Sequence, residues 1–239
     1  MSKNVVITGA NKSIGYETAR QLGQSGYRIW LGCRNEERGR AAVAALAADN
    51  IDARLVIMDV TQPDSVRAAA ERIREEDGRL DVLINNAGIP GAQLVAPSTQ
   101  SIDDIRSVYE TNVFGAIQVT QTFLPLLRAA GEARIVMVSS GLGSLNWVSD
   151  LDHPYSAVEA VGYTSSKSAL NAVTVAFAKE LAKYAISVNA VDPGYTATDF
   201  NGHTGYRTVE QAASGIVWLT EQAVSVTGGF WFDGQRAPW

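Results

Sequence analysis

Apolar, strand-like runs alternate with helix-like stretches along this chain, and this alternation limits the fold more than any other feature. Most of the runs are apolar at nearly every position, which is typical of parallel strands covered on both faces. They span residues 5–9, 28–33, 53–60, 80–88, 134–140, 186–194 and 228–234, and helix-like stretches between them include 14–26, 36–50 and 63–78. The pattern predicts an α/β fold: a doubly wound parallel sheet of the Rossmann type, with about seven strands and helices on both faces.

Signals at the ends of these segments agree with the alternation. Pro63 and Asp64 suit the start of a helix, and Gly78 suits its end. No linker, repeat or low-complexity segment interrupts the pattern, so we expect residues 1–239 to form a single Rossmann-type domain. Open sheets of this kind bind ligands at the carboxyl ends of their strands, so we expect the functional residues there.

Composition excludes several classes of function. The chain has 239 residues, of which 46% are hydrophobic and 19% charged, and its net charge of −5 argues against nucleic acid as a partner. The single cysteine, Cys33, allows no intrachain disulfide, and we expect it to be buried at a strand end. The N-terminus lacks a signal-peptide pattern and no apolar run is long enough to span a bilayer, so we expect a cytoplasmic protein with no membrane partner.

Two local patterns point to chemistry. Tyr163 and Lys167 lie four residues apart in a helix-like stretch, which places them on one face of the helix. A nearby ammonium favours the phenolate, so we expect a lowered pKa for Tyr163. Near the N-terminus, an apolar strand runs into a turn that contains Gly9 and Gly15 and then into a helix, which is how a nucleotide pyrophosphate is held.

Together with four further motifs, these patterns resemble the classical short-chain dehydrogenase/reductase family over nearly the whole chain. The motifs are TGANKSIG at 8–15, NNAG at 85–88, Asn112 in YETNVFG, Ser140 in IVMVSSG, the Tyr163 and Lys167 pair, and Pro-Gly at 193–194. Within the family, NKSIG, GCRNEERG and LDVLINNAGI look closest to the NADPH-dependent carbonyl reductases. The resemblance implies a catalytic domain that reduces a ketone or aldehyde to an alcohol by hydride transfer from NADP(H), with a tyrosine as general acid.

The resemblance also assigns catalytic roles. Tyr163 would be the general acid, and Lys167 would lower its pKa and hydrogen-bond the nicotinamide ribose. Asn112 would hold a water that relays protons to the lysine; the alternative for this mid-helix residue is a buried structural amide.

A serine would orient the substrate carbonyl in this scheme. The family match assigns that role to Ser140, with Ser139 as the fallback. Tyr155 competes with Tyr163 for the role of acid, but the residue four positions further on is Glu159, so Tyr155 lacks an ammonium partner.

The end of the second strand favours NADP(H) over NAD(H). No acid stands there to bind the ribose hydroxyls of NAD, and Arg34 offers a planar fork that matches a 2′-phosphate. Lys12 adds a second positive charge; solvated surface charges are the alternative for both. The resemblance implies further cofactor-binding residues: Gly9, Asn11, Ser13, Ile14, Gly15, Asp59, Val60, Asn86, Ala87, Gly88, Tyr163, Lys167, Pro193, Gly194 and Thr196.

Three of these residues carry particular expectations. Asp59 would accept from the adenine amine, or else cap the helix that follows; Thr196 would contact the nicotinamide carboxamide. Ser13 stands where the family pattern has another glycine, so its side chain either crowds the pyrophosphate, donates to it or is simply tolerated. This departure concerns cofactor affinity more than cofactor identity.

The substrate side is less defined. The segment between Ser140 and Tyr163 is longer than in most members of the family, and it either roofs the substrate pocket or forms a surface loop with its own hydrophobic anchor. Residues 195–208 would form a short substrate lid. The residues expected in the pocket are Ser140, Leu142, Trp147, Tyr163 and Tyr195, and no metal site is expected because His153 and His203 do not cluster with other ligands.

Two other functions and two states of assembly compete with these expectations. A non-catalytic NADP-binding sensor could use the same fold, although it would not need all four catalytic residues. A sugar-nucleotide epimerase or dehydratase needs a larger C-terminal substrate domain than we expect after Gly194. Besides a small carbonyl or alcohol substrate, a homodimer through the helices of Asn112 and Tyr163 is one expectation, and a monomer follows if the longer loop covers that face.

Overall fold

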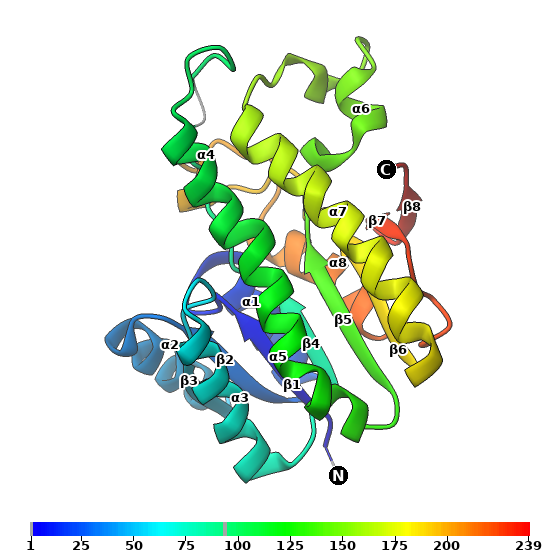
Figure 1. Ribbon diagram of the computed structural model, residues 1–239. Helices are drawn as coiled ribbons and strands as arrows, with labels where there is room; N and C mark the ends of the chain where they lie inside the picture. Colours follow the sequence, from blue (N-terminus) through cyan, green and yellow to red (C-terminus); the bar gives the residue numbers. More distant parts are fainter. Residues whose placement is uncertain (1, 93–94) are drawn as a thin grey trace.

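The computed structural model describes residues 2–92 and 95–239, and its described residues form an eight-stranded sheet. Its strand order is β3-β2-β1-β4-β5-β6-β7-β8, in which β7 and β8 pair antiparallel and all other neighbours pair parallel (Figure 1). The strands are β1 (Asn4–Thr8), β2 (Arg28–Cys33), β3 (Ala53–Ile57), β4 (Val82–Asn85), β5 (Ala133–Val138), β6 (Ile186–Val191), β7 (Phe230–Phe232) and β8 (Gln235–Ala237). The doubly wound fold is therefore confirmed.

Helices cover both faces of the sheet and enclose two apolar cores. The helices are α1 (Ser13–Gln24), α2 (Glu36–Ala48), α3 (Pro63–Asp77), α4 (Ile102–Tyr109), α5 (Ala116–Ala129), α6 (Leu145–Ser149), α7 (Val161–Leu181) and α8 (Val209–Thr220). One core packs α3, α5 and α7 against the sheet, and the other packs α1, α2 and α8 against the opposite face. Figure 1 shows α5 and α7 side by side along one face.

Local sequence signals account for several helix ends. Pro63 occupies the first turn of α3, and Gly78 ends the helix in the left-handed conformation, with φ of 69°. The Asn35 side chain accepts from the backbone N–H of Arg38 and so caps α2, whose first turn carries two acids. Cys33 is buried as expected.

The eighth strand goes beyond the expectation of about seven. β8 pairs along its three residues with β7, and the turn between them contains Asp233 and Gly234, both with positive φ. The strand is short and starts with two exposed polar residues, so no apolar run in the sequence predicts it.

The strands bring distant motifs to one edge of the sheet. Thr8, Asn85, Val138 and Val191 are the last residues of β1, β4, β5 and β6, which are neighbours in the sheet. Val138 pairs in register with Val191, so the segments that follow these two strands begin side by side. None of the described helices is long and apolar enough to cross a membrane.

Candidate active site

Helix α7 carries Tyr163 and Lys167 and is held close to the segment after β5 by a glycine. A Cβ on Gly143 would lie 2.7 Å from the carbonyl carbon of Lys167, so only glycine permits this approach. The Gly143 carbonyl accepts hydrogen bonds from Ser168 at 3.0 Å and from Asn171 at 3.1 Å. These contacts fix the position of α7 relative to the end of β5.

Lys167 is a buried cation whose ammonium is anchored to the backbone. Its exposed fraction is 4%, and its Nζ donates to the Val138 carbonyl at 2.8 Å. Burial lowers the pKa of Lys167 to about 8, and the negative charge of Asp192 acts in the opposite direction. Lys167 is therefore close to its titration midpoint at mildly alkaline pH.

Tyr163 is half-buried, and the expectation of a lowered pKa is not met in this structure. Burial raises the pKa of its phenol, a hydrogen bond with Ser140 lowers it, and the charge of Asp192 raises it further. The Lys167 ammonium lies 5.7 Å from the centroid of the Tyr163 ring and donates to the Val138 carbonyl. Desolvation thus outweighs the neighbouring ammonium, and Tyr163 is a neutral phenol at physiological pH.

Asn112 lies in a π-helical segment, Glu110–Gly115, between α4 and α5. Such widened turns occur often at functional sites. The side chain of Asn112 is 1% exposed; its Oδ1 accepts from the Ile89 N–H at 2.9 Å, and its Nδ2 donates to the Ile89 carbonyl and to Ser166 Oγ. A Cβ on Gly88 would lie 3.3 Å from this Oδ1 and 3.7 Å from Lys167 Nζ, so the amide and the ammonium both lie close to Gly88.

The two serines after β5 point to different surroundings. Ser139 is 2% exposed and donates to Asn171 Oδ1 at 2.6 Å, so its hydroxyl supports α7. Ser140 Oγ accepts from the Leu142 N–H at 3.2 Å, and its hydroxyl interacts with the phenol of Tyr163. This geometry favours Ser140 over Ser139 as the residue beside the reacting group.

The glycine turn after β1 packs against the segment after β4. Thr8 Oγ1 accepts from the backbone N–H groups of Asn86 and Ala87, both at 2.9 Å, and Asn86 Nδ2 donates to the Thr8 carbonyl at 2.8 Å. A Cβ on Gly15 would lie 2.5 Å from Asn86 Nδ2, and Gly9 has φ of 64°. Glycine is therefore required at both positions for the turn to close on NNAG.

Ser13 adopts a backbone conformation that favours glycine. Its φ is 56°, in the left-handed region that costs a residue with a Cβ roughly 1–2 kcal/mol. The family pattern has glycine here, so the departure noted in the sequence is also a conformational cost. It falls at the start of α1, next to Lys12.

The two cations expected to read a 2′-phosphate have different surroundings. Arg34 is exposed and forms no salt bridge within 2–92 and 95–239. Lys12 Nζ instead contacts Asp199 Oδ2 at 2.7 Å, and the other oxygen of Asp199 contacts His203 Nε2 at 2.9 Å. The glycine turn is thereby tied to the segment after β6.

The remaining residues of the predicted cofactor site lie along the same edge. Asp59 Oδ1 accepts from the N–H and the hydroxyl of Thr61 in the turn before α3, while the N-cap of α3 is Gln62, with no side-chain cap bond. Val60 packs against Gly115 of the π-helical segment. Thr196 Oγ1 donates to the carbonyls of Pro193 and Gly194, both at 3.1 Å, and Asn11 and Ile14 are partly exposed in the glycine turn.

On the substrate side, the long segment after Ser140 has an aromatic anchor on the sheet. Trp147 stacks on His153, with ring centroids 5.2 Å apart, and its ring packs on Phe230 and Phe232 of β7. The place of Trp147 in the substrate pocket stays a prediction. Leu142 is partly buried and stays beside Ser140.

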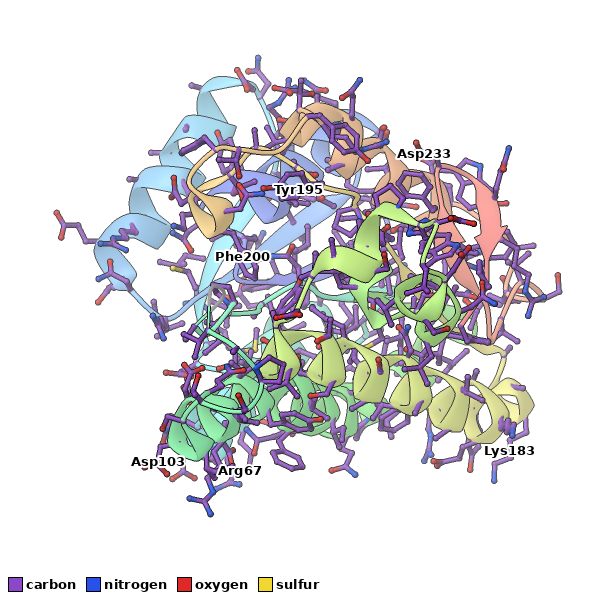
Figure 2. All side chains as sticks on the ribbon, turned by 90° about the horizontal axis from the view of Figure 1, so that it is seen from above. Arg67, Asp103, Lys183, Tyr195, Phe200 and Asp233 are labelled. Atoms are coloured by element: carbon purple, nitrogen blue, oxygen red, sulfur yellow. The ribbon has the colours of Figure 1, made fainter. Side chains whose placement is uncertain are left out.

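The segment after β6 contacts the site. Phe200 packs against the Tyr163 ring, with centroids 5.5 Å apart, and Tyr195 hydrogen-bonds Thr204 within the same segment. Figure 2 labels Phe200 and Tyr195 in this segment. An open cavity of about 500 Å³ lies beside Phe200, lined by Pro90, Gly91, Ala92, Val95, Phe200, Asn201 and Gly202. Tyr195 is 42% exposed and packs on Tyr206.

Sequence reasoning missed three residues of the site: Phe200, Asp192 and Arg207. Asp192 stands directly before the Pro-Gly motif at the end of a strand, and an acid at that position was a signal that could have identified it. Phe200 and Arg207 follow in the same segment but carry no motif. The described residues contain no group of three His, Cys, Asp or Glu side chains that could hold a metal ion.

The residues at this edge fit a dinucleotide. Gly9 and Gly15 let the turn after β1 pack closely on residues 86 and 87, and this turn leads directly into the N-terminus of α1 at Ser13, where a pyrophosphate would be held. Arg34 supplies a cation without a described salt-bridge partner at the end of β2, the position that distinguishes the two nicotinamide cofactors.

Comparison with known proteins identifies the family of the chain. A family model described as short chain dehydrogenase matches residues 3–207. The short-chain dehydrogenase anuI of Penicillium roqueforti is 40% identical over 219 residues, which cover 89% of this chain and 86% of that protein. The NADPH-bound carbonyl reductase from chicken fatty liver superposes with a TM-score of 0.88 at 28% identity, over 100% of this chain and 99% of that one. An NAD⁺-bound xylitol dehydrogenase superposes with a TM-score of 0.85 at 26% identity, over 97% of each chain.

The chain belongs to the short-chain dehydrogenase family of oxidoreductases. Its structural neighbours include enzymes bound to either nicotinamide cofactor, and several are bound to NADPH or NADP.

Proposed function

We propose that this protein is an NADP(H)-dependent reductase that converts a ketone or aldehyde to an alcohol, with Tyr163 as general acid. One observation carries the proposal: Asn112, Ser140, Tyr163 and Lys167 come from three separate segments and meet at the carboxyl edge of the sheet. Lys167 lies beside Val138, Asn112 and Lys167 both lie close to Gly88, and Ser140 interacts with Tyr163. The single-domain organisation of 1–239 and the lid at 195–208 are parts of this proposal.

The reaction needs a hydride, a proton and a means of stabilising negative charge on the carbonyl oxygen. The bound nicotinamide supplies the hydride. Ser140 donates a hydrogen bond to the substrate oxygen, and Tyr163 transfers its phenolic proton to that oxygen as charge develops. Because Tyr163 is a neutral phenol before the reaction, it arrives with the proton in place.

Lys167 and Asn112 help to return a proton to Tyr163 after it has protonated the substrate. The Lys167 ammonium stabilises the Tyr163 phenolate that the proton transfer leaves behind. Two hydrogen bonds to the Ile89 backbone hold the Asn112 amide in place beside Gly88. We assign it to the path by which solvent protons return to Lys167 and Tyr163.

NADP(H) is the proposed cofactor because Arg34, and no acid, follows β2. Arg34 is exposed and forms no salt bridge to a described residue, so its guanidinium is available for the 2′-phosphate. Lys12 contributes only if the phosphate competes with Asp199 for its ammonium. We therefore assign the main role to Arg34.

A turnover screen tests the proposal. NADPH consumption is measured with aldehydes, simple ketones, quinones, diketones and cyclic ketones, each with the unaltered protein and with Tyr163→Phe. We expect NADPH oxidation with at least one carbonyl class and its loss in the variant. NADPH binding by calorimetry without turnover of any class would instead support a cofactor-binding sensor.

A further inference from the structure

Asp192 is a buried acid at the edge of the site with one oxygen left unpartnered. Its exposed fraction is 4%, and its Oδ1 accepts from the Gly194 N–H at 2.9 Å. Its Oδ2 has no hydrogen-bond partner in the described part of the chain. A Cβ on Gly141 would lie 2.8 Å from this Oδ2, so a glycine in the segment after β5 leaves room for the carboxylate.

The β5–β6 pair places this acid close to Lys167. Lys167 Nζ donates to the carbonyl of Val138, the last residue of β5, which pairs in register with Val191, the last residue of β6. Asp192 is the next residue after Val191. No carboxylate of 2–92 or 95–239 forms a salt bridge with Lys167, so the nearest anion acts through space inside the protein.

An ion pair between Arg207 and Asp233 lies between Asp192 and the surface. Arg207 is 13% exposed and makes a bidentate contact with Asp233, at 2.6 and 2.7 Å. Its Nε is buried without a described partner and would lie 3.0 Å from a Cβ on Gly194, the residue whose N–H binds Asp192. Charges therefore alternate from exposed Asp233, labelled at the rim in Figure 2, through Arg207 and Asp192 to Lys167.

We propose that Asp192 is a positioning residue whose buried negative charge keeps the Lys167 ammonium protonated. This role rests on the proposed reductase function, because it matters only where Lys167 supports a tyrosine acid. Two opposite charges attract each other more strongly inside the protein than in water. A single buried carboxylate can therefore oppose the effect of desolvation on the pKa of the lysine. Burial raises the pKa of the Asp192 carboxyl, and the Gly194 N–H and the charge of Arg207 oppose that rise and favour the carboxylate that this role requires.

Other titratable groups face Asp192, and none replaces its charge. The phenols of Tyr155 and Tyr163 face it from the long segment and from α7, and the charges of Arg207 and Asp233 act on it from the segment after β6 and the turn before β8. Burial and the Asp192 charge both raise the pKa of Tyr155 and Tyr163, so these phenols are neutral at physiological pH. Asp192 is thus the anion that distinguishes a charged from a neutral Lys167.

The first test measures Lys167 directly in the cofactor-free protein. Lysines are labelled with ¹³C at Cε, the Lys167 signal is assigned by its loss in Lys167→Arg, and its titration is followed by NMR. We expect the titration midpoint to move to lower pH in Asp192→Asn. Asp233→Asn is the matched control, because it removes the same charge from the exposed end of the line and should move the midpoint much less.

The second test follows activity against pH. In Asp192→Asn, we expect the ratio of kcat at pH 8 to kcat at pH 6 to fall by about tenfold. The same substitution in a Lys167→Arg background should leave that ratio unchanged, because arginine stays charged. Asp192→Ser removes the same charge with a smaller side chain. It replaces Asp192→Asn in this test if that variant does not fold.

The outcomes separate this role from the proposed function. An unchanged Lys167 midpoint in both neutral variants would overturn the role of Asp192, whatever the enzyme reduces. An activity loss that is equal at all pH values would also overturn it, since it would indicate packing or substrate contact. A shifted midpoint in a protein that reduces no carbonyl would uphold the charge effect and refute the reductase function.

Discussion

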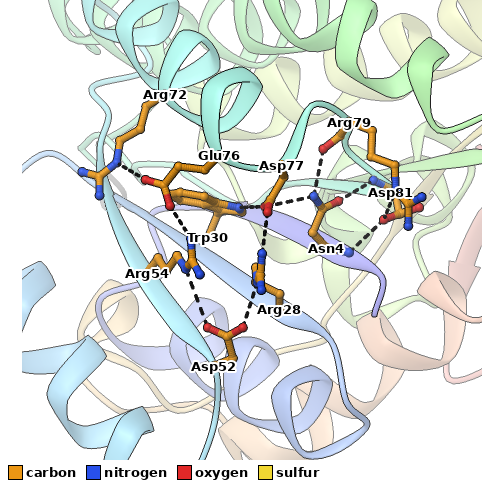
Figure 3. Close-up of polar contacts among 10 residues, drawn as sticks. All are labelled: Asn4, Arg28, Trp30, Asp52, Arg54, Arg72, Glu76, Asp77, Arg79 and Asp81. Atoms are coloured by element: carbon orange, nitrogen blue, oxygen red, sulfur yellow. Dashed lines mark hydrogen bonds and ion pairs between the residues drawn. The ribbon is translucent and has the colours of Figure 1, made fainter. Parts of the chain in front are cut away.

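The two ends of the sheet differ in whether their buried polar groups have hydrogen-bond partners. At the amino end, Asp77 accepts hydrogen bonds from Trp30 at 2.7 Å, Asn4 at 3.1 Å and Arg28 at 2.5 Å (Figure 3). Asn4 and Asp81 also bind each other's backbone N–H groups through their side chains, both at 2.9 Å. The guanidinium groups of Arg54 and Arg72 lie over the ring of Trp30 and contact Glu76, which completes the network.

The carboxyl end leaves polar groups without protein partners. The buried polar atoms without a described hydrogen-bond partner are Asn85 Oδ1, Asp192 Oδ2 and Arg207 Nε, and all three lie at or beyond the carboxyl ends of strands. A buried unpaired polar group costs stability, so such groups mark places that folding alone does not explain. The comparison indicates that the amino end stabilises the sheet and the carboxyl end is arranged for ligands and chemistry.

Replacing the acid at the carboxyl end should have the largest effect. We predict that Tyr163→Phe lowers kcat for carbonyl reduction by about 10²–10⁴-fold, because it removes the phenolic proton but keeps the ring that packs on Phe200. NADPH affinity and the thermal midpoint should stay close to those of the unaltered protein. Steady-state kinetics, calorimetry and thermal unfolding measure the three quantities.

Tyr155→Phe is the matched control for that experiment. Tyr155 is a partly buried tyrosine beside Asp192 and Gly141, but its phenol has no cation four residues further on. Its removal should change kcat little. If Tyr155→Phe abolished reduction while Tyr163→Phe retained it, the long segment would supply the acid and our assignment would be wrong.

The next effect concerns cofactor choice. We predict that Arg34→Asp combined with Lys12→Ala weakens NADPH binding by roughly 100-fold, and NADH binding far less, because two cations are lost and a repulsive charge is added. Binding of both cofactors is measured by calorimetry. An equal loss for both would show that these residues do not read the phosphate.

Asp199→Asn separates the two cations. It releases Lys12 from its ion pair and leaves Arg34 untouched, so NADPH should bind as well as before or more tightly. A marked loss of NADPH affinity would mean that the tie between the glycine turn and the segment after β6 supports the cofactor site.

The amino end should respond through stability and not through catalysis. We predict that Asp77→Asn lowers the free energy of unfolding by about 2 kcal/mol, because Arg28 and Trp30 lose a buried charged acceptor. kcat per folded molecule should not change. Asp52→Asn is the control: Asp52 contacts the same arginine at 2.8 Å but is 53% exposed, so its loss should cost much less.

The pH dependence of this difference follows from the Asp77 carboxylate. Burial alone would raise its pKa, but the hydrogen bonds from Trp30, Asn4 and Arg28 together hold the pKa below its ordinary value. A depressed pKa stabilises the folded protein fully above the unfolded-state pKa of about 4, and this stabilisation is lost as the pH falls below it. The gap between Asp77→Asn and the unaltered protein should therefore close under acid, as measured by denaturant unfolding.

Sequence reasoning predicted what local signals encode. Neighbouring residues in the sequence determine the glycine turn, the ends of α3 at Pro63 and Gly78, and the spacing of Tyr163 and Lys167. These features were therefore visible before the structure. The pKa of Tyr163 was misjudged because spacing shows the ammonium four residues away but not the burial of the phenol. Similarly, Lys12 was assigned to the phosphate without regard to Asp199, which lies 187 positions further along the chain.

Long-range packing explains the other differences. The ring of Trp147 packs on Phe230 and Phe232, a contact that no local pattern predicts because β7 reaches that place only once the sheet has formed. Phe200 and Arg207 join the site through the path of the segment after β6, which no periodicity describes. β8 has too few residues for an alternating pattern to appear.

The smallest effect should come from Ser13, where the carboxyl end carries strain in the backbone. We predict that Ser13→Gly raises the free energy of unfolding by about 0.5 kcal/mol: glycine removes the cost of φ at 56°, and its greater freedom in the unfolded chain cancels part of the gain. Turnover should be similar and NADPH should bind somewhat more tightly, because the backbone can approach the pyrophosphate. Ser13→Ala keeps the Cβ without the hydroxyl and separates the two contributions. If calorimetry shows weaker NADPH binding in both variants, the serine hydroxyl donates to the phosphate, and this departure from the family pattern is itself part of the cofactor site.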